Sequence, residues 1–179
     1  MRTIIFAFLA FMVFVTQAMA FNWISGGGAK DTKANRVLAQ SAIAASVTGT
    51  TSETTLATYT LPANVLGNNG ALRVVWLVTT TNSANNKTLR MKFGNNSLHT
   101  SVLTTSTGAR YQTDVRNRGT TDSQLSFGTG IYGASAGTLP TTSAISTTAP
   151  VVITITGQLA NTGETITLEG YTIELLPGN

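Results

Sequence analysis

Two stretches of alternating apolar and polar residues, joined by a short polar segment, dominate the middle of this sequence. Each has the period of two that is typical of a half-buried β-strand. The apolar positions that share one face are Leu72, Val74, Trp76 and Val78 in the first stretch and Leu89, Met91 and Phe93 in the second. The joining segment, residues 82–86 (NSANN), consists of residues that tolerate tight turns. We therefore expect residues 71–94 to form a β-hairpin at the centre of a β-sandwich.

Similar alternation recurs along most of the chain, in residues 53–61, 97–105, 109–118, 123–127, 151–159 and 165–176. Pro62 ends the first of these because proline cannot donate to a sheet, and Gly170 predicts a bulge or corner in the last. About eight or nine short strands separated by turn residues indicate an all-β sandwich or barrel, and the lack of helical patterns between them excludes a parallel α/β fold. Residues 128–149, rich in glycine, serine and threonine, are expected to form a long loop used for contacts.

The N-terminal residues differ from the rest. Residues 1–20 (MRTIIFAFLAFMVFVTQAMA) combine one arginine, an apolar run and a small-residue ending, which is the pattern of a signal peptide cleaved before Phe21. The alternative is an uncleaved apolar helix that serves as an anchor. Residues 21–45 are expected to be a linker or arm, either a short helix or extended, and residues 46–179 a single antiparallel β-sandwich domain.

Composition narrows the classes of function. Only 10% of the residues are charged, and the formal net charge of +4 comes from scattered basic residues, which argues against a nucleic-acid-binding surface. The sequence has no cysteine, so disulfides, thiolate metal sites and cysteine nucleophiles are excluded.

The sequence contains little that resembles an active site. The one histidine, His99, follows Leu98 in a strand, so alternation predicts an exposed side chain, and no nucleophile stands in a distinctive context. Asp114 and Asp122 flank a turn and are the two carboxylates that could approach each other. No motif has metal-ligand or phosphate-loop spacing. We expect no catalytic residue, no metal and no cofactor, and therefore no enzyme.

Surface contacts are the remaining source of function. Lys87, Arg90 and Lys92 are expected on or beside the outward face of the central hairpin, and Arg110, Arg116 and Arg118 on one face of a later strand; we interpret both groups as solvated surface. Loops around residues 81–87, 106–109, 119–122 and 128–149 are expected to make contacts. The residues predicted for this role are Asn82, Asn85, Asn86, Arg116, Arg118 and Tyr132.

Residues 49–94 and 151–176 resemble a family of jelly-roll proteins from tailed phages, of the tail-fibre, spike or head-decoration type. Its most specific parts are residues 50–56, 61–70, 82–90 and 155–176. The resemblance implies a jelly-roll sandwich, a homotrimer and a virion-attached or receptor-facing role, and it brings no catalytic motif. Residues 1–20 depart from the pattern, because virion proteins assemble in the cytoplasm and normally lack an export signal. From the strand pattern alone, a jelly roll and another Greek-key sandwich remain open.

Our hypothesis is a non-enzymatic structural and binding component of a phage virion, facing a host receptor. Its partners are other virion proteins or copies of itself, with a cell-surface glycan as a further ligand, no nucleic acid, and a membrane only through residues 1–20. The alternative is an exported bacterial surface or filament-associated module that binds glycan. A jelly-roll glycosidase is a distant third class.

Overall fold

The computed structural model describes residues 34–129 and 140–178. All of these residues belong to one compact unit of the chain, Thr32–Asn179. The predicted signal peptide or apolar helix at residues 1–20, and Tyr132 in the long loop, lie outside the described residues. Within the described ranges no helix is long and apolar enough to cross a membrane.

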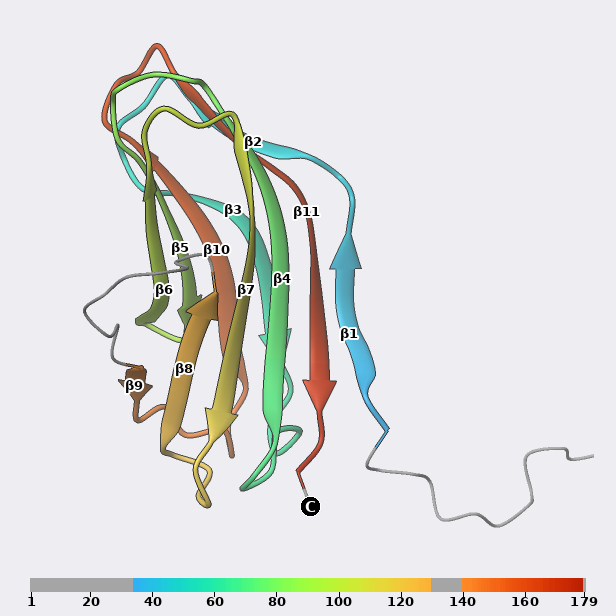
Figure 1. The fold of residues 1–179 in the computed structure, drawn as a ribbon. Coiled ribbons are helices and arrows are strands. Elements are labelled where there is room, and N and C mark those ends of the chain that lie inside the picture. Colours follow the sequence, from blue (N-terminus) through green and yellow to red (C-terminus); the bar gives the residue numbers. More distant parts are fainter. Residues whose placement is uncertain (1–33, 130–139, 179) are drawn as a thin grey trace, which may run out of the picture. The chain divides into compact units, whose positions relative to one another are not determined.

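The described residues form eleven strands in two antiparallel sheets (Figure 1). The strands are β1 (Arg36–Ser41), β2 (Ala45–Thr48), β3 (Thr54–Leu61), β4 (Ala71–Thr80), β5 (Lys87–Phe93), β6 (Asn96–Leu103), β7 (Gly108–Asn117), β8 (Gln124–Thr129), β9 (Thr141–Ser143), β10 (Val151–Leu159) and β11 (Thr165–Leu176). The first sheet has the order β1-β11-β4-β7-β8-β9, with β2 also paired to β11, and the second has the order β3-β10-β5-β6. The all-β prediction is confirmed.

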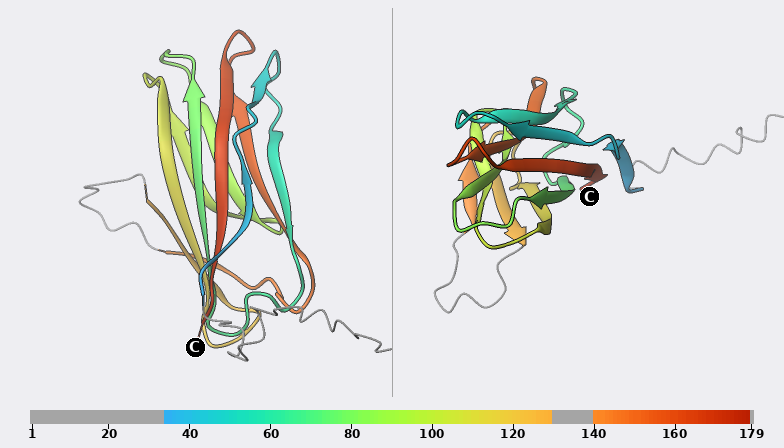
Figure 2. Two further views of the ribbon diagram at one scale, coloured as in Figure 1. Left: turned by 90° about the vertical axis from the view of Figure 1, so that its right-hand side faces the viewer. Right: turned by 90° about the horizontal axis from the view of Figure 1, so that it is seen from above.

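The two sheets pack face to face as a sandwich (Figure 2). Strands β2, β11, β4 and β7 face β3, β10, β5 and β6, and the chain crosses from one sheet to the other at most of its connections. Four strands facing four strands in this interleaved order is the jelly-roll arrangement. Strands β8 and β9 extend the first sheet beyond β7, and β1 continues the edge formed by β2.

The predicted hairpin over residues 71–94 is wrong. Strand β4 pairs with β11 and β7, whereas β5 pairs with β10 and β6, so residues 81–86 form an arch between the sheets. Alternation shows which side chains point inward but not which sheet a strand joins, and both arrangements satisfy it. The inward-facing residues of the two strands therefore meet across the core rather than side by side.

The segment assigned as a linker or arm is extended over β1. Residues 36–41 pair with the C-terminal part of β11, and residues 45–48 pair with its N-terminal part. Within residues 34–45, the described part of this segment, no helix forms, so the helical alternative is wrong there. The register of β11 against β4 shifts between Leu168 and Gly170, which confirms the bulge predicted from Gly170.

The core lies between the sheets and follows the alternation in the sequence. All seven inward positions predicted in β4 and β5 are at most 3% exposed, with Trp76, Leu89, Met91 and Phe93 fully buried. Strand β10, beside β5, adds Ile153 and Ile155 to the core, and strand β11, beside β4, adds Ile166 and Ile173. The hydrophobic effect of burying these aliphatic and aromatic side chains is the main contribution to holding the two sheets together.

Candidate functional site

His99 lies inside the sandwich, contrary to the prediction from alternation. It is 8% exposed, and its ring packs edge-on against Trp76 and Tyr111, with ring centroids 5.4 and 5.1 Å away. The reason is a β-bulge: Met91 pairs with His99 but Lys92 pairs with Ser97, so Leu98 is an extra residue in β6. Leu98 and His99 can therefore both point inward.

The surroundings of His99 do not form a catalytic triad. Its Nδ1 is 2.8 Å from the hydroxyl of Thr113, a residue that is itself fully buried. The next polar pair is Ser101 Oγ and Tyr111 OH, at 2.8 Å. No carboxylate is paired with the ring within the described residues, so nothing orients it as a general base. These contacts hold the residue as a polar part of the core.

Burial also lowers the pKa of His99, because the charged imidazolium loses its water. As the only histidine in the chain, it gives a single Cε1 proton signal in an NMR pH titration. We expect a midpoint below the ordinary value of 6.5. Since the unfolded chain takes up this proton first, the free energy of unfolding should fall as pH decreases through 6.5 and level off at the folded pKa. A midpoint at or above 6.5 would place the ring in water and contradict the buried position.

Lys87, expected on or beside the outward face, is fully buried. It has the same strand parity as Leu89, Met91 and Phe93, so the sequence did carry the signal. Its Nζ donates to the Ser83 carbonyl oxygen and hydroxyl at 3.2 and 3.0 Å and lies 4.0 Å from a carboxylate oxygen of Glu164. The ion pair joins the start of β5 to the β10–β11 connection, and the hydrogen bonds to Ser83 attach the β4–β5 arch to the same point.

Glu164 accepts further hydrogen bonds at this end of the sandwich. Ser83 Oγ donates to its Oε1, and Asn85 Nδ2 donates to the same oxygen at 3.1 Å. The hydrogen bond from Ser83, followed by those of Asn85 and the charge of Lys87, lowers the pKa of this carboxyl despite its burial. Asn85, predicted as a contact residue, is exposed like Asn82 and Asn86, but its amide is committed in part to this cluster.

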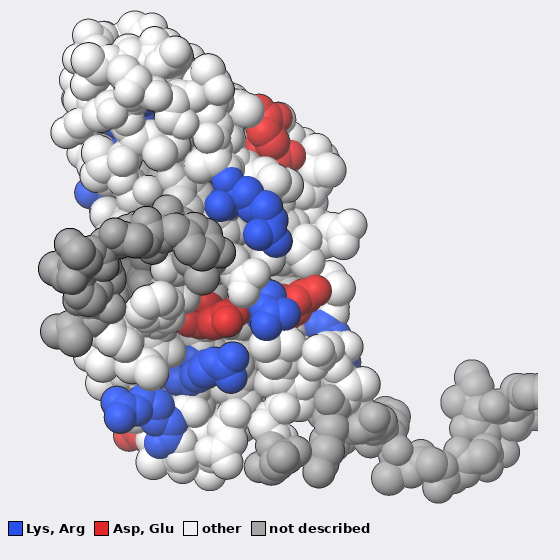
Figure 3. Space-filling model, viewed as in Figure 1, with Lys and Arg blue, Asp and Glu red and all other residues white. Residues whose placement is uncertain are grey.

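The outer face of the first sheet carries a row of alternating charges (Figure 3). Arg73 lies 3.3 Å from Asp114 and 3.9 Å from Glu174, and Asp114 lies 3.9 Å from Arg116. Asp114 is thus held between two arginines. Asp122 lies in the β7–β8 loop, and three residue pairs of the β7–β8 ladder separate it from Asp114, so the structure does not bring the two together as an acid pair.

The predicted contact residues that the structure describes fall at opposite ends of the sandwich. Asn82, Asn85 and Asn86 follow the end of β4, whereas Arg116 pairs with Ala71 at the start of β4. Arg116 and Arg118 are exposed. These residues do not make one surface, and the structure contains a different hollow that the sequence did not reveal.

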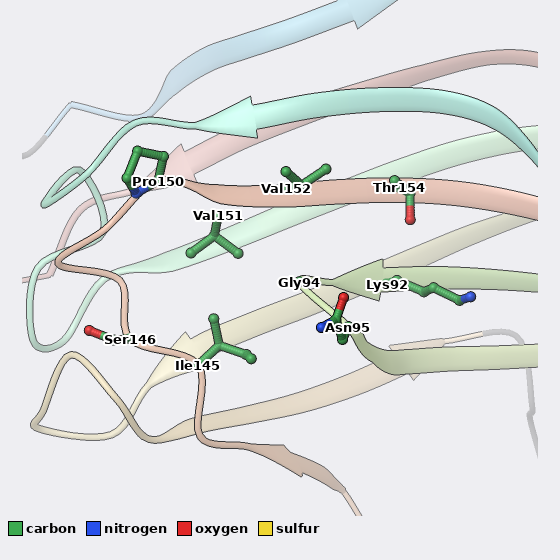
Figure 4. Close-up of a pocket in the computed structure, with 9 residues that line it drawn as sticks. All are labelled: Lys92, Gly94, Asn95, Ile145, Ser146, Pro150, Val151, Val152 and Thr154. Atoms are coloured by element: carbon green, nitrogen blue, oxygen red, sulfur yellow. The ribbon is translucent and has the colours of Figure 1, made fainter.

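That hollow is a groove of about 570 Å³ at the end of the second sheet (Figure 4). Three segments line it: the end of β5 with its turn, residues 145–146, and the start of β10. The lining residues are Lys92, Gly94, Asn95, Ile145, Ser146, Pro150, Val151, Val152 and Thr154. It combines aliphatic side chains with an amide, two hydroxyls and one ammonium group.

Local structure fixes the walls of this groove. The β5–β6 hairpin turns through Gly94 and Asn95, and Gly94 has φ = 57°, a conformation that favours glycine. On the opposite side, the fully buried Gln124 brackets Ile145: its Oε1 accepts from the Ile145 N–H at 3.0 Å, and its Nε2 donates to the Ile145 carbonyl at 2.9 Å. Gly94 and Ile145 are in contact, since a Cβ on Gly94 would meet the Ile145 side chain at 3.3 Å.

No group of three or more histidine and carboxylate side chains that could hold a metal occurs within residues 34–129 and 140–178. Ion pairs and hydrogen bonds explain why the pKa values of Glu53 and Glu164 lie below the ordinary value. Burial raises the pKa of Glu53, but hydrogen bonds from Lys92 and Thr156 and the charges of Lys92 and Arg90 more than offset this, so that its pKa lies below the ordinary value.

No family model matches this chain, and no curated protein matches it in sequence. Among solved structures it is similar to the lectin I from Ulex europaeus, in complex with the methyl glycoside of alpha-L-fucose, with 7% identity, a TM-score of 0.37, and coverage of 79% of this chain and 91% of the lectin. It is also similar to a chain of the infectious bursal disease virus Gx strain, with 13% identity and a TM-score of 0.24, covering 82% of this chain and 43% of the viral one. Both TM-scores are below 0.5, so neither likeness indicates what this chain does.

Proposed function

We propose that this chain is a non-enzymatic structural and binding component of a phage virion, of the tail-fibre, spike or head-decoration type. The observation that carries the proposal is the jelly-roll order of the two sheets, an architecture that recurs in viral capsid and lectin domains. The resemblance of residues 49–94 and 151–176 to tailed-phage proteins favours a phage particle as the assembly that contains this fold.

The polar groups of the described residues support a structural role. His99 is enclosed by Trp76, Tyr111 and Thr113, and Asp114 is paired with arginines. Side chains that are committed to the core and to cross-strand ion pairs stabilise a scaffold and are not free to act on a substrate. In this role the outer faces and loops contact other virion proteins or further copies of the chain, in the trimer implied by the resemblance.

The groove beside Asn95 favours a second candidate, an exported surface module that binds glycan. Export would remove residues 1–20 and leave Phe21 as the first residue, whereas an anchor would leave Met1 in place. Mass spectrometry of the purified native protein distinguishes these two N-termini.

The test of the leading proposal is the location of the protein. We expect it to copurify with phage particles through a density gradient and to be present at a fixed ratio to the major capsid protein. Particles that lack it would overturn the proposal. Recovery from the culture medium with Phe21 as the first residue would support the second candidate instead.

A further inference from the structure

We infer that the groove beside Asn95 is a binding site for a neutral saccharide; this rests on the proposed role as a binding module and names its ligand class. The groove is formed by the β5–β6 turn, the segment held by Gln124 and the start of β10. Its volume of about 570 Å³ lies in the range of small-molecule sites.

The charges around the groove argue against an acidic ligand. Lys92 is the one cation that lines it, and its Nζ lies 2.6 Å from Glu53 Oε1. Glu53 is also 3.5 Å from Arg90, so the carboxylate sits between two cations on the outer face of the second sheet. An acidic sugar or a phosphate would have to compete with this carboxylate for Lys92. A neutral ligand has no such cost.

The polar groups of the groove match the hydroxyls of a sugar. The Asn95 amide and the Thr154 hydroxyl make no side-chain hydrogen bond within the described residues, so both can bond to a ligand. An amide offers two donors and one acceptor oxygen, and a hydroxyl is both donor and acceptor, which suits vicinal sugar hydroxyls. Ser146 adds a second hydroxyl, 2.8 Å from that of Thr148.

The apolar part of the groove suits the C–H face of a pyranose ring. Val152 is 42% exposed at the start of β10, and Ile145 is held in place through its backbone by Gln124. A sugar that covers these aliphatic groups removes them from water while its hydroxyls bond at the rim. Figure 4 shows that Ile145 and Val152 come from different segments on either side of Gly94.

The face beside the groove can take a longer glycan. Across the second sheet, Thr58 pairs with Thr154, Thr154 with Lys92, and Lys92 with Ser97, so a row of hydroxyls crosses the outer face. This row carries hydroxyl groups on both sides of the neutralised Lys92. An oligosaccharide that enters the groove can therefore continue along the sheet.

The test is an NMR titration of the full-length ¹⁵N-labelled protein with the methyl glycosides of glucose, galactose and mannose and with N-acetylglucosamine. We expect at least one to shift the amide signals of Gly94, Asn95, Ser146 and Val152, with a dissociation constant on the order of millimolar. Asn95→Ala should weaken this binding about three- to tenfold, as expected for the loss of one or two hydrogen bonds. The matched control, Gln40→Ala, removes an exposed amide from β1 of the first sheet, outside the groove, and should leave the affinity unchanged.

The inference would be overturned by no shift with any neutral sugar, by shifts at these residues only with N-acetylneuraminic acid, or by an equal response to Gln40→Ala and Asn95→Ala. Shifts at these amides with a short threonine-rich peptide but no sugar would assign the groove to protein contacts instead and would also overturn it. The titration does not depend on where the protein is found, so its failure is distinguishable from a failure of the virion proposal.

Discussion

Replacing Trp76 with alanine is expected to lower the free energy of unfolding by about 3–5 kcal/mol, the usual cost of truncating a large aromatic residue in a core. Trp76 is fully buried in β4 and packs against Tyr111, with ring centroids 4.6 Å apart, and against His99. A cavity there would remove contacts with both sheets. For a domain of this size the melting temperature should fall on the order of 10 °C.

Trp76→Phe is the matched control. The indole Nε1 is buried and has no hydrogen-bond partner in the described part of the protein, so phenylalanine removes an unpaired donor along with some volume. These two effects oppose each other, and we expect a change within about 1.5 kcal/mol, as for conservative core replacements. Urea unfolding followed by circular dichroism measures both variants. An alanine variant as stable as the wild-type protein would contradict the position of Trp76 between the sheets.

Removing the buried cation at Lys87 should give the second large effect. Lys87→Met leaves the buried carboxylate of Glu164 without its cation, with only the hydrogen bonds from Ser83 and Asn85, and it leaves the Ser83 carbonyl without the Nζ donor. Breaking a buried pair from one side is strongly destabilising because the remaining charge is uncompensated. The loss of unfolding free energy should be several times the loss caused by Arg116→Gln. That variant removes the ion pair between Arg116 and Asp114, and a surface ion pair of this kind contributes about 0–1 kcal/mol.

The double variant Lys87→Met, Glu164→Leu tests whether the pair itself is responsible. It removes both charges, so it should recover most of the stability lost in Lys87→Met. A double variant whose loss equals the sum of the two single losses would show that the groups do not interact.

The pH dependence gives a further check on this ion pair. The folded-state pKa of Glu164 is below its ordinary value of 4.5, so the pair contributes fully above that pH and its contribution is lost as pH falls through the folded pKa. The difference in unfolding free energy between wild type and Lys87→Met should therefore shrink as the pH is lowered below 4.5. A difference that stays constant across this window would remove Glu164 as the partner.

The strands themselves could be predicted from the sequence because alternation reports burial directly. Strands β4, β5, β10 and β11 follow their predicted ranges closely, and their apolar positions form the core. What alternation does not contain is the identity of the neighbouring strand. That is why two strands facing each other across the core were interpreted as a hairpin: a six-residue polar connection suits an arch as well as a turn.

The predicted exposure of two side chains, Lys87 and His99, was wrong for different reasons. Lys87 has the same strand parity as the core residues of β5, so the alternation indicates burial. The usual exposure of lysine side chains favours the opposite prediction, which is wrong here. His99 is different, because its inward direction depends on an extra residue, Leu98, within β6. No glycine or other local signal marks that bulge, and it becomes apparent only from the pairing with β5.

The groove could not be predicted from the sequence at all. Asn95, Ile145 and Val152 are ordinary residue types, and about fifty positions separate the first from the others. Only the jelly-roll crossing brings them together, and only the contacts of Gln124 fix Ile145 in the wall. A sequence motif reveals a site whose residues are close together in the chain, whereas the residues that line this groove are brought together only by the fold.

Quantitative mass spectrometry of gradient-purified particles, alongside the culture medium and cell fractions, tests directly whether this jelly roll is part of a phage virion. We expect the protein to be enriched in the particles, in a constant ratio to the major capsid protein across the gradient. Its absence from the particles, with the protein recovered in the medium or on the cell surface, would show that it is not a virion component.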